Sequence, residues 1–579
     1  MSKFTLHYSK IPLLDIASLE KTFVPTLEDV EHGHNPFQIH ALQHYNPVYS
    51  LFFEMSGKNY DKIALNHPLH MTSMNQVLNL STKLSIDKPV FIKYSPLLDP
   101  IRYMIGKYKS EAGSIRVLPD YQQSNNSFAK LVSPNNASYT DNFFSYLVGQ
   151  LRHHHDFCHG LEYYGSFLGV QKKFKMNVTD DVDYLQESNY YVENLNKLFS
   201  ITGPVMQNEF ADFGSRGNKT KLAISDSELC TELSDADLGA EELDMEILDE
   251  TSENLDCLQE EELVYKQTDN NSKSGSGSES GSEEGSEEGS EEGSEEGSEE
   301  GSEEGSEEGS EEELDDDYST IDDEDEDEIF QYAYINDFPV QLICLEKCEG
   351  TLDELFLRRE ITCDQAASAL FQVIMTLLAY QKAFHFTHND LHTNNIMFVS
   401  TELDYLTYQF NNKTYKVPTY GKIFKLIDFG RSIYTFQGQH FCSDSFAPSG
   451  DAATQYNCEP FMNENKPRID PNYSFDLCRL GCSIYDFIID SENPDKMDDL
   501  QKTVYRWCQD DSGKNVLYKR NGDERYPNFK LYKMIARTVH QHTPEEQLTF
   551  SYFNQFLAES EDVGAVTVNI DTLPSYVKL

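Results

Sequence analysis

The pattern of apolar and polar positions predicts folded structure in two separate stretches, and the first covers residues 1–170. Residues 88–94 form a short apolar run that ends at a Ser-Pro pair, which predicts a buried strand. Over residues 140–151 apolar side chains recur every three or four positions behind a threonine that can cap a helix, so a helix is expected there. Residues 161–170 are aromatic and apolar, which indicates a second strand.

The second stretch begins near residue 331 and is longer. Its clearest element is a helix over residues 364–383, where alanine, leucine, valine and isoleucine side chains form one apolar stripe. Short strands are expected before and after this helix, and the chain beyond residue 470 is expected to be largely helical. The predicted strands cover residues 339–345, 395–399 and 422–427.

Residues 171–330 separate the two stretches and have the composition of an insert. Of the 99 acidic residues in the chain, 45 lie between residues 225 and 330, beside 2 basic ones. Residues 281–312 are eight consecutive Gly-Ser-Glu-Glu tetrads. Charge repulsion and the lack of apolar residues keep such a sequence unfolded, so the insert is expected to be disordered from about residue 225. It would act as a solvated spacer or as a tether for basic proteins, which its charge attracts.

Charge and cysteine content narrow the classes of function. The formal net charge is −53, and leaving out residues 225–330 leaves 54 acidic and 44 basic residues, a net charge of −10. This balance argues against nucleic acid or an anionic membrane as the main partner. The chain begins without a signal peptide, has no apolar run that could span a bilayer, and scatters its 11 cysteines without a CxxC pair. An intracellular, cytoplasmic protein is expected.

The sharpest chemical signal is a pair of motifs in the second stretch. The sequence His-Asn-Asp-Leu-His-Thr-Asn-Asn runs from His388 to Asn395 before a predicted strand, and Asp-Phe-Gly begins at Asp428 after the next strand. Phosphoryl transfer needs a carboxylate that orients the acceptor hydroxyl, and it needs oxygen ligands that hold Mg²⁺. Asp390 suits the first task, and Asn395 and Asp428 suit the second.

These motifs resemble the H-R-D-L-x-x-x-N and D-F-G signatures of the protein-kinase superfamily. Three more segments occur in the matching order, namely VFIK at the end of the first predicted strand, the hinge-like LEKCEGTL, and DLCRLG, whose Asp476 braces the catalytic loop in that family. The resemblance implies an α+β, bilobal protein-kinase-like fold that uses ATP and Mg²⁺. It also implies the site residues: Lys93, Glu346 and Cys348 for ATP, Asn395 and Asp428 for Mg²⁺, and Asp390 for catalysis.

The resemblance divides the chain as well. Residues 1–170 would hold an N-terminal extension and the first part of the small lobe, and the long disordered acidic insert at 171–330 would follow its fourth strand. Residues 331–350 would supply the last strand of the small lobe and the hinge, and residues 351–579 the large lobe. The pattern is most similar to the divergent kinases of giant DNA viruses, which would place the protein in the host cytoplasm or in the virion.

Several positions depart from the family's pattern. Asn389 replaces the arginine that usually contacts a phosphorylated activation loop, so control by phosphorylation of that loop is not expected. His392 stands where serine/threonine kinases have lysine, a form similar to small-molecule kinases of the aminoglycoside type and to haspin-like protein kinases. No glycine-rich loop precedes Lys93, and the predicted helix offers Asp141 instead of the glutamate that usually pairs with this lysine.

Three interpretations follow. The first is an ATP-dependent protein serine/threonine kinase whose substrate is a protein, with a basic protein as the favoured kind. The second is a small-molecule kinase, and the third is a pseudokinase scaffold that binds basic partners through the acidic insert. The intact Asp390, Asn395 and Asp428 favour an enzyme, whereas the missing glycine-rich loop and the missing helix glutamate favour a scaffold. The sequence leaves the oligomeric state open.

Overall fold

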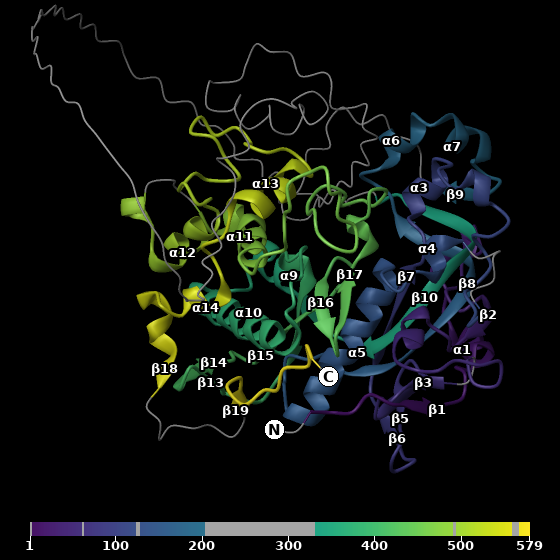
Figure 1. Cartoon of the computed structure of the whole chain (residues 1–579), viewed down its shortest axis with the longest axis horizontal. Helices are drawn as coiled ribbons and strands as arrows, with labels where there is room; N and C mark the ends of the chain where they lie inside the picture. The colour runs from purple at the N-terminus through teal and green to yellow at the C-terminus, as the bar shows by residue number, and fades with distance from the viewer. Residues whose placement is uncertain are drawn as a thin grey trace, which may run out of the picture. The chain divides into compact units, whose positions relative to one another are not determined.

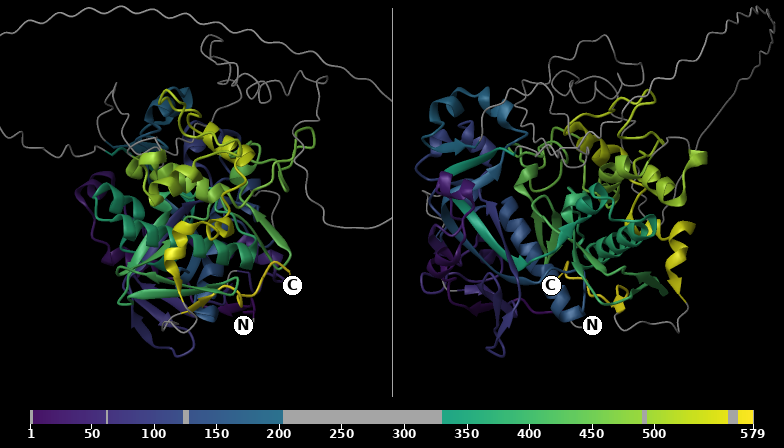
Figure 2. Two further views of the ribbon diagram at one scale, coloured as in Figure 1. Left: turned by 90° about the vertical axis from the view of Figure 1, so that its left-hand side faces the viewer. Right: turned by 180° about the vertical axis from the view of Figure 1, so that it is seen from behind.

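The computed structural model describes residues 3–60, 63–122, 128–202, 330–489, 494–558 and 567–578. Within these residues the chain mixes helices and strands in an α+β arrangement (Figures 1 and 2). We call residues 3–202 and 330–346 the sheet region and residues 347–578 the helical region. The Gly-Ser-Glu-Glu tetrads and the other acidic residues up to residue 329, which were predicted to be disordered, lie outside the described residues.

A five-stranded antiparallel sheet forms the centre of the sheet region (Figure 1). The order of its strands is β2-β8-β10-β7, and β9 also pairs with β10. β10 is the central strand because Ile343 pairs with Lys93 of β7 on one side, while Val340 pairs with Gly169 of β8 on the other. The strands are Ile39–Gln43 (β2), Val90–Pro96 (β7), Tyr163–Asn177 (β8), Phe199–Ile201 (β9) and Tyr332–Glu346 (β10).

The strands predicted over residues 88–94, 161–170 and 339–345 are confirmed as β7, β8 and β10, and two of them are longer than expected. β8 continues past residue 170, where the insert was expected to begin, and Gln171 and Asn177 still pair with β10. Its extension was hard to recognise because lysines dominate it, although Phe174 is buried. The chain then forms α6, α7 and β9 before residue 203.

Helix α5 (Ala137–His155) confirms the helix predicted over residues 140–151, and its residues from Ser138 to Leu151 are all buried. The N-terminal part of the chain covers one side of it, since Phe52 stacks on Phe143 and the hydroxyl of Tyr146 donates a hydrogen bond to Asn66. Apolar side chains at helical spacing predicted this helix, but its polar side chains are buried as well: Asp141 pairs with Lys93 of β7, and Gln150 donates to the carbonyl oxygen of Asn66. The first residues therefore belong to the sheet region.

The helical region is built around α10 (Cys363–Phe384), which confirms the helix predicted over residues 364–383. Thr362 and Gln365 form a reciprocal capping box at its start. Two predicted strands, β12 (Ile396–Ser400) and β15 (Lys422–Leu426), pair with each other, and β11 (Gly350–Thr351) extends them to a three-stranded sheet. This sheet fixes the two chain segments that carry the predicted motifs.

The prediction that residues 470–579 are largely helical is right in part. Among its described residues are four α-helices, namely α11 (Phe475–Ile488), α12 (Asp499–Trp507), α13 (Lys530–Thr538) and α14 (Pro544–Gln547). Residues 508–529 instead follow turns and isolated bridges, and β18 and β19 extend the β13–β14 hairpin. The two chain ends lie side by side, because Lys3 Nζ donates to the carbonyl of Lys578 (Figure 2). Among the described helices, none combines the length and the apolar character needed to cross a membrane.

The remaining elements are shorter. Those of the sheet region are β1 (Tyr8–Lys10), α1 (Ile16–Thr22), α2 (Leu27–His32), η1 (Pro47–Leu51), β3 (Ile63–Leu65), β4 (Leu69–Ser73), β5 (Gln76–Asn79), β6 (Ser85–Asp87), α3 (Pro100–Met104), η2 (Lys109–Glu111), α4 (Ala129–Val132), α6 (Val182–Gln186) and α7 (Asn189–Asn194). Those of the helical region are α9 (Leu352–Leu357), η4 (Thr393–Asn395), β13 (Tyr405–Phe410), β14 (Lys413–Pro418), β16 (Ile433–Phe436), β17 (Gln439–Cys442), η5 (Asp444–Phe446), η6 (Pro494–Lys496), η7 (Ser551–Phe556), β18 (Leu557–Ala558) and β19 (Thr567–Asn569).

Candidate functional site

Lys93 lies at the centre of an ionic cluster that three chain segments build. Strand β7 supplies Lys93, helix α5 supplies Asp141, and the segment after β15 supplies Asp428. The Lys93 Nζ atom lies 2.6 Å from Asp141 Oδ2 and 2.8 Å from Asp428 Oδ1. Burial alone would lower the pKa of Lys93, but the two carboxylates raise this pKa above its usual range. Lys93 is therefore a fully charged ammonium group held between two acids.

Asp141 fills the place for which the sequence offered no glutamate. Its Oδ2 pairs with Lys93, and its Oδ1 accepts a hydrogen bond of 2.9 Å from the backbone N–H of Phe429. One buried carboxylate thus ties α5 both to β7 and to the Asp-Phe-Gly motif. Glu162, the other nearby acid, pairs instead with Lys88 at 2.5 Å and with Arg152 at 3.3 Å.

The Asp-Phe-Gly motif is anchored by its phenylalanine. Phe429 is completely buried and packs edge-on against Phe144 of α5, with the ring centroids 4.8 Å apart. Asp428 has a φ of 61°, a left-handed conformation that aspartate tolerates better than most residues. Its side chain is 47% exposed and reaches Lys93. The motif therefore presents a carboxylate at the surface of the cluster while its neighbour holds the backbone.

A buried carboxylate, that of Asp476, holds loop 388–395 in place. It accepts hydrogen bonds from the backbone N–H of His388 at 2.9 Å and of Asn389 at 2.8 Å. The loop in turn contacts the residue before Asp428, because the His388 ring nitrogen Nε2 lies 2.9 Å from the Ile427 carbonyl oxygen. These bonds bring the two predicted motifs together.

Asn395 has one end of its side chain fixed. Its Nδ2 donates to the carbonyl oxygen of Asp390 at 2.9 Å and lies 3.1 Å from Nε2 of His392. Because an amide N–H is a donor, Nε2 of His392 must accept, and burial lowers the pKa of this histidine to about 4. His392 is therefore neutral near pH 7. It leaves the Oδ1 atom of Asn395 as the end of the amide available to a metal ion.

Asp390 has both carboxylate oxygens engaged. Its Oδ1 accepts a hydrogen bond of 2.7 Å from the hydroxyl of Tyr532, and its Oδ2 lies 3.4 Å from Nη1 of Arg431. Arg431 also binds Asp451 at 2.8 Å. Burial alone would raise the pKa of Asp390, but the positive charges around it, with Arg431 the foremost, and the hydrogen bond from Tyr532 together hold this pKa well below its usual range. Asp390 is therefore ionised at every pH near neutrality.

Sequence reasoning missed both partners of Asp390. Arg431 directly follows the Asp-Phe-Gly motif, and this closeness to the motif could have marked it as a residue of the site. Tyr532 lies 142 residues after Asp390 on α13, and no motif marks it.

Asn389 connects loop 388–395 to residues 428–460 through neutral hydrogen bonds. Its Nδ2 donates to the Arg431 carbonyl at 2.9 Å, and its Oδ1 accepts from the Tyr456 hydroxyl at 2.8 Å. Further along, Asp444 binds Lys130 at 2.7 Å and accepts from the backbone N–H of Ala137 at the start of α5. Carboxylates and neutral hydrogen bonds therefore hold this segment against α5 and the loop.

The two predicted residues of the hinge stand apart from the Lys93 cluster. Ile343, the partner of Lys93 in the sheet, lies three residues before Glu346, or about 10 Å along the strand. The Glu346 side chain is taken up by an ion pair with the fully buried Lys425. Cys348 is half-buried, and burial raises the pKa of its thiol to about 12, so it is a neutral group.

The turn between β4 and β5 precedes Lys93 in the chain, in the part of the sequence where the family pattern has a glycine-rich loop. Its residues 73–76 contain no glycine. The carbonyl oxygen of Met74 accepts a hydrogen bond of 2.8 Å from the backbone N–H of Val90, at the start of the strand that carries Lys93. This turn is thus tied to β7 by backbone bonds.

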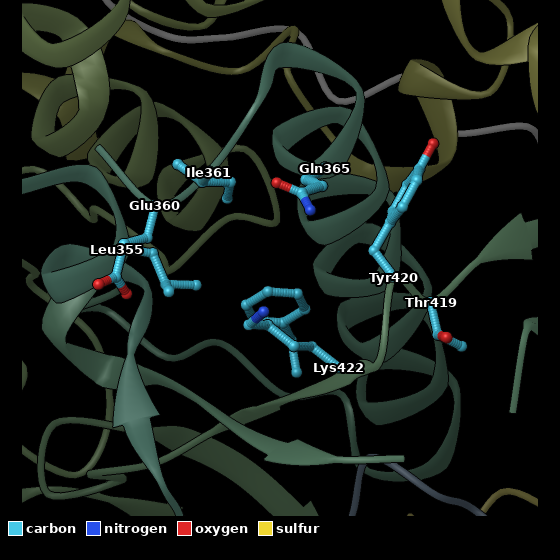
Figure 3. A pocket seen from close by; sticks show the side chains of 8 residues that line it. Leu355, Glu360, Ile361, Gln365, Thr419, Tyr420 and Lys422 are labelled. Carbon is cyan, nitrogen blue, oxygen red and sulfur yellow. The ribbon is translucent and has the colours of Figure 1, made fainter. Parts of the chain in front are cut away.

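A separate hollow lies in the helical region, between α9, α10 and the turn before β15 (Figure 3). Leu355, Ile361 and Gln365 line one side of it, and Tyr420 and Lys422 line the other. It contains none of the predicted site residues.

Comparison with known proteins gives matches over short segments. Serine/threonine-protein kinase haspin of Mus musculus is 38% identical over 64 residues, which are 11% of this chain and 8% of haspin. A probable serine/threonine-protein kinase of Dictyostelium discoideum is 48% identical over 52 residues, 9% of this chain and 4% of that protein. Haspin of Bos taurus is 33% identical over 88 residues, 15% of this chain and 11% of haspin.

No protein-family model matches the chain. The chain aligns with only 4–11% of the length of these three relatives. The matches therefore indicate a kinase-like relationship. The similarity to viral kinases stays a prediction.

Proposed function

We propose that this chain is an ATP-dependent phosphotransferase with a bilobal, protein-kinase-like fold, and that it acts as a protein serine/threonine kinase. One observation carries the proposal: Lys93 binds both Asp141 and Asp428, which lie on elements far apart in sequence. A protein that does not use a charged lysine beside an exposed carboxylate would have little reason to bring these three residues together. The short matches to serine/threonine kinases support the same class.

The donor atoms of the site fit ATP and Mg²⁺. Lys93 is a charged ammonium that suits phosphate, and Asp428 and the free amide end of Asn395 offer the oxygen ligands that Mg²⁺ prefers. The backbone around Glu346 and Cys348 would hold the base, because the Glu346 side chain is already paired with Lys425. When bound, ATP with Mg²⁺ supplies the γ-phosphoryl group and neutralises part of its charge.

The residues of this chain would act mainly by orientation. The ionised Asp390 would accept a hydrogen bond from the acceptor hydroxyl, direct the oxygen toward phosphorus, and take up its proton as the new O–P bond forms and the bond to the leaving ADP breaks. Lys93 and the ligands of Mg²⁺ stabilise the negative charge of the phosphoryl oxygens. The hydrogen bonds from Asp476 to loop 388–395 fix the backbone around Asp390.

A basic protein is the acceptor we favour, because the chain without residues 225–330 still carries a net charge of −10. A small-molecule acceptor remains the second candidate. The observation that favours it is the buried, neutral His392, which brings no positive charge to the place where protein kinases usually have lysine. A scaffold is the third candidate, and the Lys93–Asp141 ion pair counts against it because the missing glutamate was one of its two supports.

The test is transfer from γ-labelled ATP in the presence of Mg²⁺, with a mixture of basic proteins and a pool of small hydroxylated molecules as acceptors. Asp428→Ala should reduce transfer by about 10³-fold because it removes a metal ligand. Asp470→Ala is the matched control, since Asp470 is an exposed acid of the same region that pairs with Arg468.

Label in protein supports the kinase, and label in the small pool supports the second candidate. Equal transfer by wild type and Asp428→Ala would contradict the proposal, and so would the absence of both transfer and ATP binding.

A further inference from the structure

Tyr532 is the residue outside the motifs that approaches Asp390 most closely. Its hydroxyl lies 2.7 Å from Asp390 Oδ1, although it belongs to α13, near the other end of the helical region. The carboxylate has no proton to give, so the phenol is the donor in this hydrogen bond. Arg431 occupies the other carboxylate oxygen at 3.4 Å. The plane of the Asp390 carboxylate is thus fixed from two directions.

The ring of Tyr532 has little freedom to move. The side chain is 5% exposed. The guanidinium of Arg479 lies 4.9 Å from the ring centroid. Phe529 stacks on the ring at 5.4 Å, and Phe475 lies 6.2 Å away. A side chain held on several sides is a fixed support and is poorly suited to swing aside when a substrate arrives.

Burial also keeps the phenol protonated. It raises the pKa of Tyr532 to about 12, so the O–H remains a donor throughout the neutral range. The same contacts link five side chains in one network, which runs from Asp451 through Arg431, Asp390 and Tyr532 to Arg479.

We infer that Tyr532 is a positioning residue for phosphoryl transfer: its O–H fixes the Asp390 carboxylate so that the remaining lone pairs face the acceptor hydroxyl. Each carboxylate oxygen has two acceptor positions; Tyr532 takes one on Oδ1, and Arg431 holds Oδ2 through its charge at 3.4 Å. The acceptor then meets a carboxylate of defined orientation, which is what a reaction that depends on alignment requires. This inference rests on the proposed function and deepens it.

The test compares Tyr532→Phe with wild type in the same transfer assay. The substitution removes one oxygen and keeps the ring, so kcat should fall about tenfold to a hundredfold while the KM values for ATP and acceptor change less than about twofold. Tyr505→Phe is the matched control, because Tyr505 is half-buried on α12, and its ring contacts Tyr485. An unchanged kcat, or a lower KM for the acceptor with a higher rate, would overturn the inference.

A second measurement tests the bond without using activity. The melting temperatures of wild type, Tyr532→Phe, Asp390→Asn and the double variant form a cycle, and the two changes should not be additive if the side chains interact. Additive effects overturn the inference whatever the transfer assay gives. A wild type that transfers no phosphoryl group overturns the proposed function and the positioning role with it. This outcome is distinct, because there is then no wild-type activity that Tyr532→Phe could reduce. An active wild type with an equally active Tyr532→Phe overturns the inference alone.

Discussion

The site contains two charged groups of residues that are assembled in different ways. The group around Lys93, with Asp141 and Asp428, joins β7, α5 and the Asp-Phe-Gly motif, and one of its carboxylates remains half exposed. The group around Asp390, with Arg431 and Tyr532, is buried and lies wholly within the helical region. The first group joins two regions of the fold and leaves the Asp428 carboxylate accessible to solvent. The second group is closed and serves to hold one carboxylate still.

The comparison teaches that the two groups should respond differently to substitution. Loss of a residue in the Lys93 group should remove both binding of a ligand and the link between the two regions. Loss of a residue in the Asp390 group should change the orientation of a single carboxylate and the stability of the helical region. The predictions that follow run from the largest expected effect to the smallest.

Lys93→Met should break the first group. It leaves Asp141 buried without its cation, so the free energy of unfolding should fall by about 3 kcal/mol, and phosphoryl transfer should fall by about 10²–10³-fold. Chemical denaturation and the transfer assay measure the two effects. Lys172→Met, an exposed lysine on β8, is the control and should change neither. A variant with normal transfer would mean that Lys93 has only a structural role.

Arg431→Gln should break the second group. Arg431 is buried and serves two carboxylates, so its loss leaves Asp390 and Asp451 without a cation and should lower the free energy of unfolding by about 3 kcal/mol. Arg468→Gln is the matched control. Arg468 also binds two acids, but its side chain is 50% exposed, so its loss should cost about 0.5 kcal/mol or less. Similar losses in the two variants, compared by urea denaturation, would contradict this view of the group.

Glu162→Gln should lower the stability of the fold and leave phosphoryl transfer unchanged. Burial would raise the pKa of Glu162, but its bonds to Lys88, Tyr164 and Arg152 lower it to about 2 from its usual 4.5. A lowered carboxyl pKa stabilises the fold above the usual value, and this stabilisation is lost as the pH falls from about 4.5 to about 2. The variant should be less stable than wild type by about 2 kcal/mol at pH 7.

The same variant tests whether an acid outside the two groups affects stability alone. Its deficit in stability should shrink below pH 4.5 and vanish near pH 2, which denaturation at a series of pH values measures. Transfer should be unchanged at pH 7, because Glu162 does not pair with Lys93. A constant deficit at all pH values, or a loss of transfer, would show that Glu162 acts in another way.

Asp444→Asn should give the smallest effect. The amide keeps an oxygen for the backbone N–H of Ala137 but loses the ion pair with Lys130, so the unfolding free energy should fall by about 1 kcal/mol. Thermal unfolding measures this change. Because Asp444 ties residues 428–460 to the start of α5, transfer should also fall a few-fold. Lys130→Met should match it, and a much larger effect for one partner would indicate that the pair is not the shared cause.

Much of the local structure was evident from the sequence because it depends on short-range patterns. The apolar stripe of α10 and the short apolar runs of β7, β12 and β15 predicted those elements within a few residues. The extension of β8 beyond residue 170 was missed, since three lysines interrupt the apolar pattern around the buried Phe174. The burial of the polar side chains of α5 was not evident from the sequence, because it depends on distant segments: Asp141 pairs with Lys93 of β7, and Tyr146 contacts Asn66.

The sequence alone indicated the candidates for the chemistry, because Asp390, Asn395 and Asp428 occur at spacings that local motifs fix. Only the tertiary structure decided what holds them. Asp141 is the partner of Lys93 because α5 packs beside β7, and Tyr532 supports Asp390 because α13 folds back over loop 388–395 from 142 residues away. Such contacts depend on the packing of distant elements, and no pattern of neighbouring residues encodes their distance. The motifs identify the candidate groups, and the fold sets how they are held.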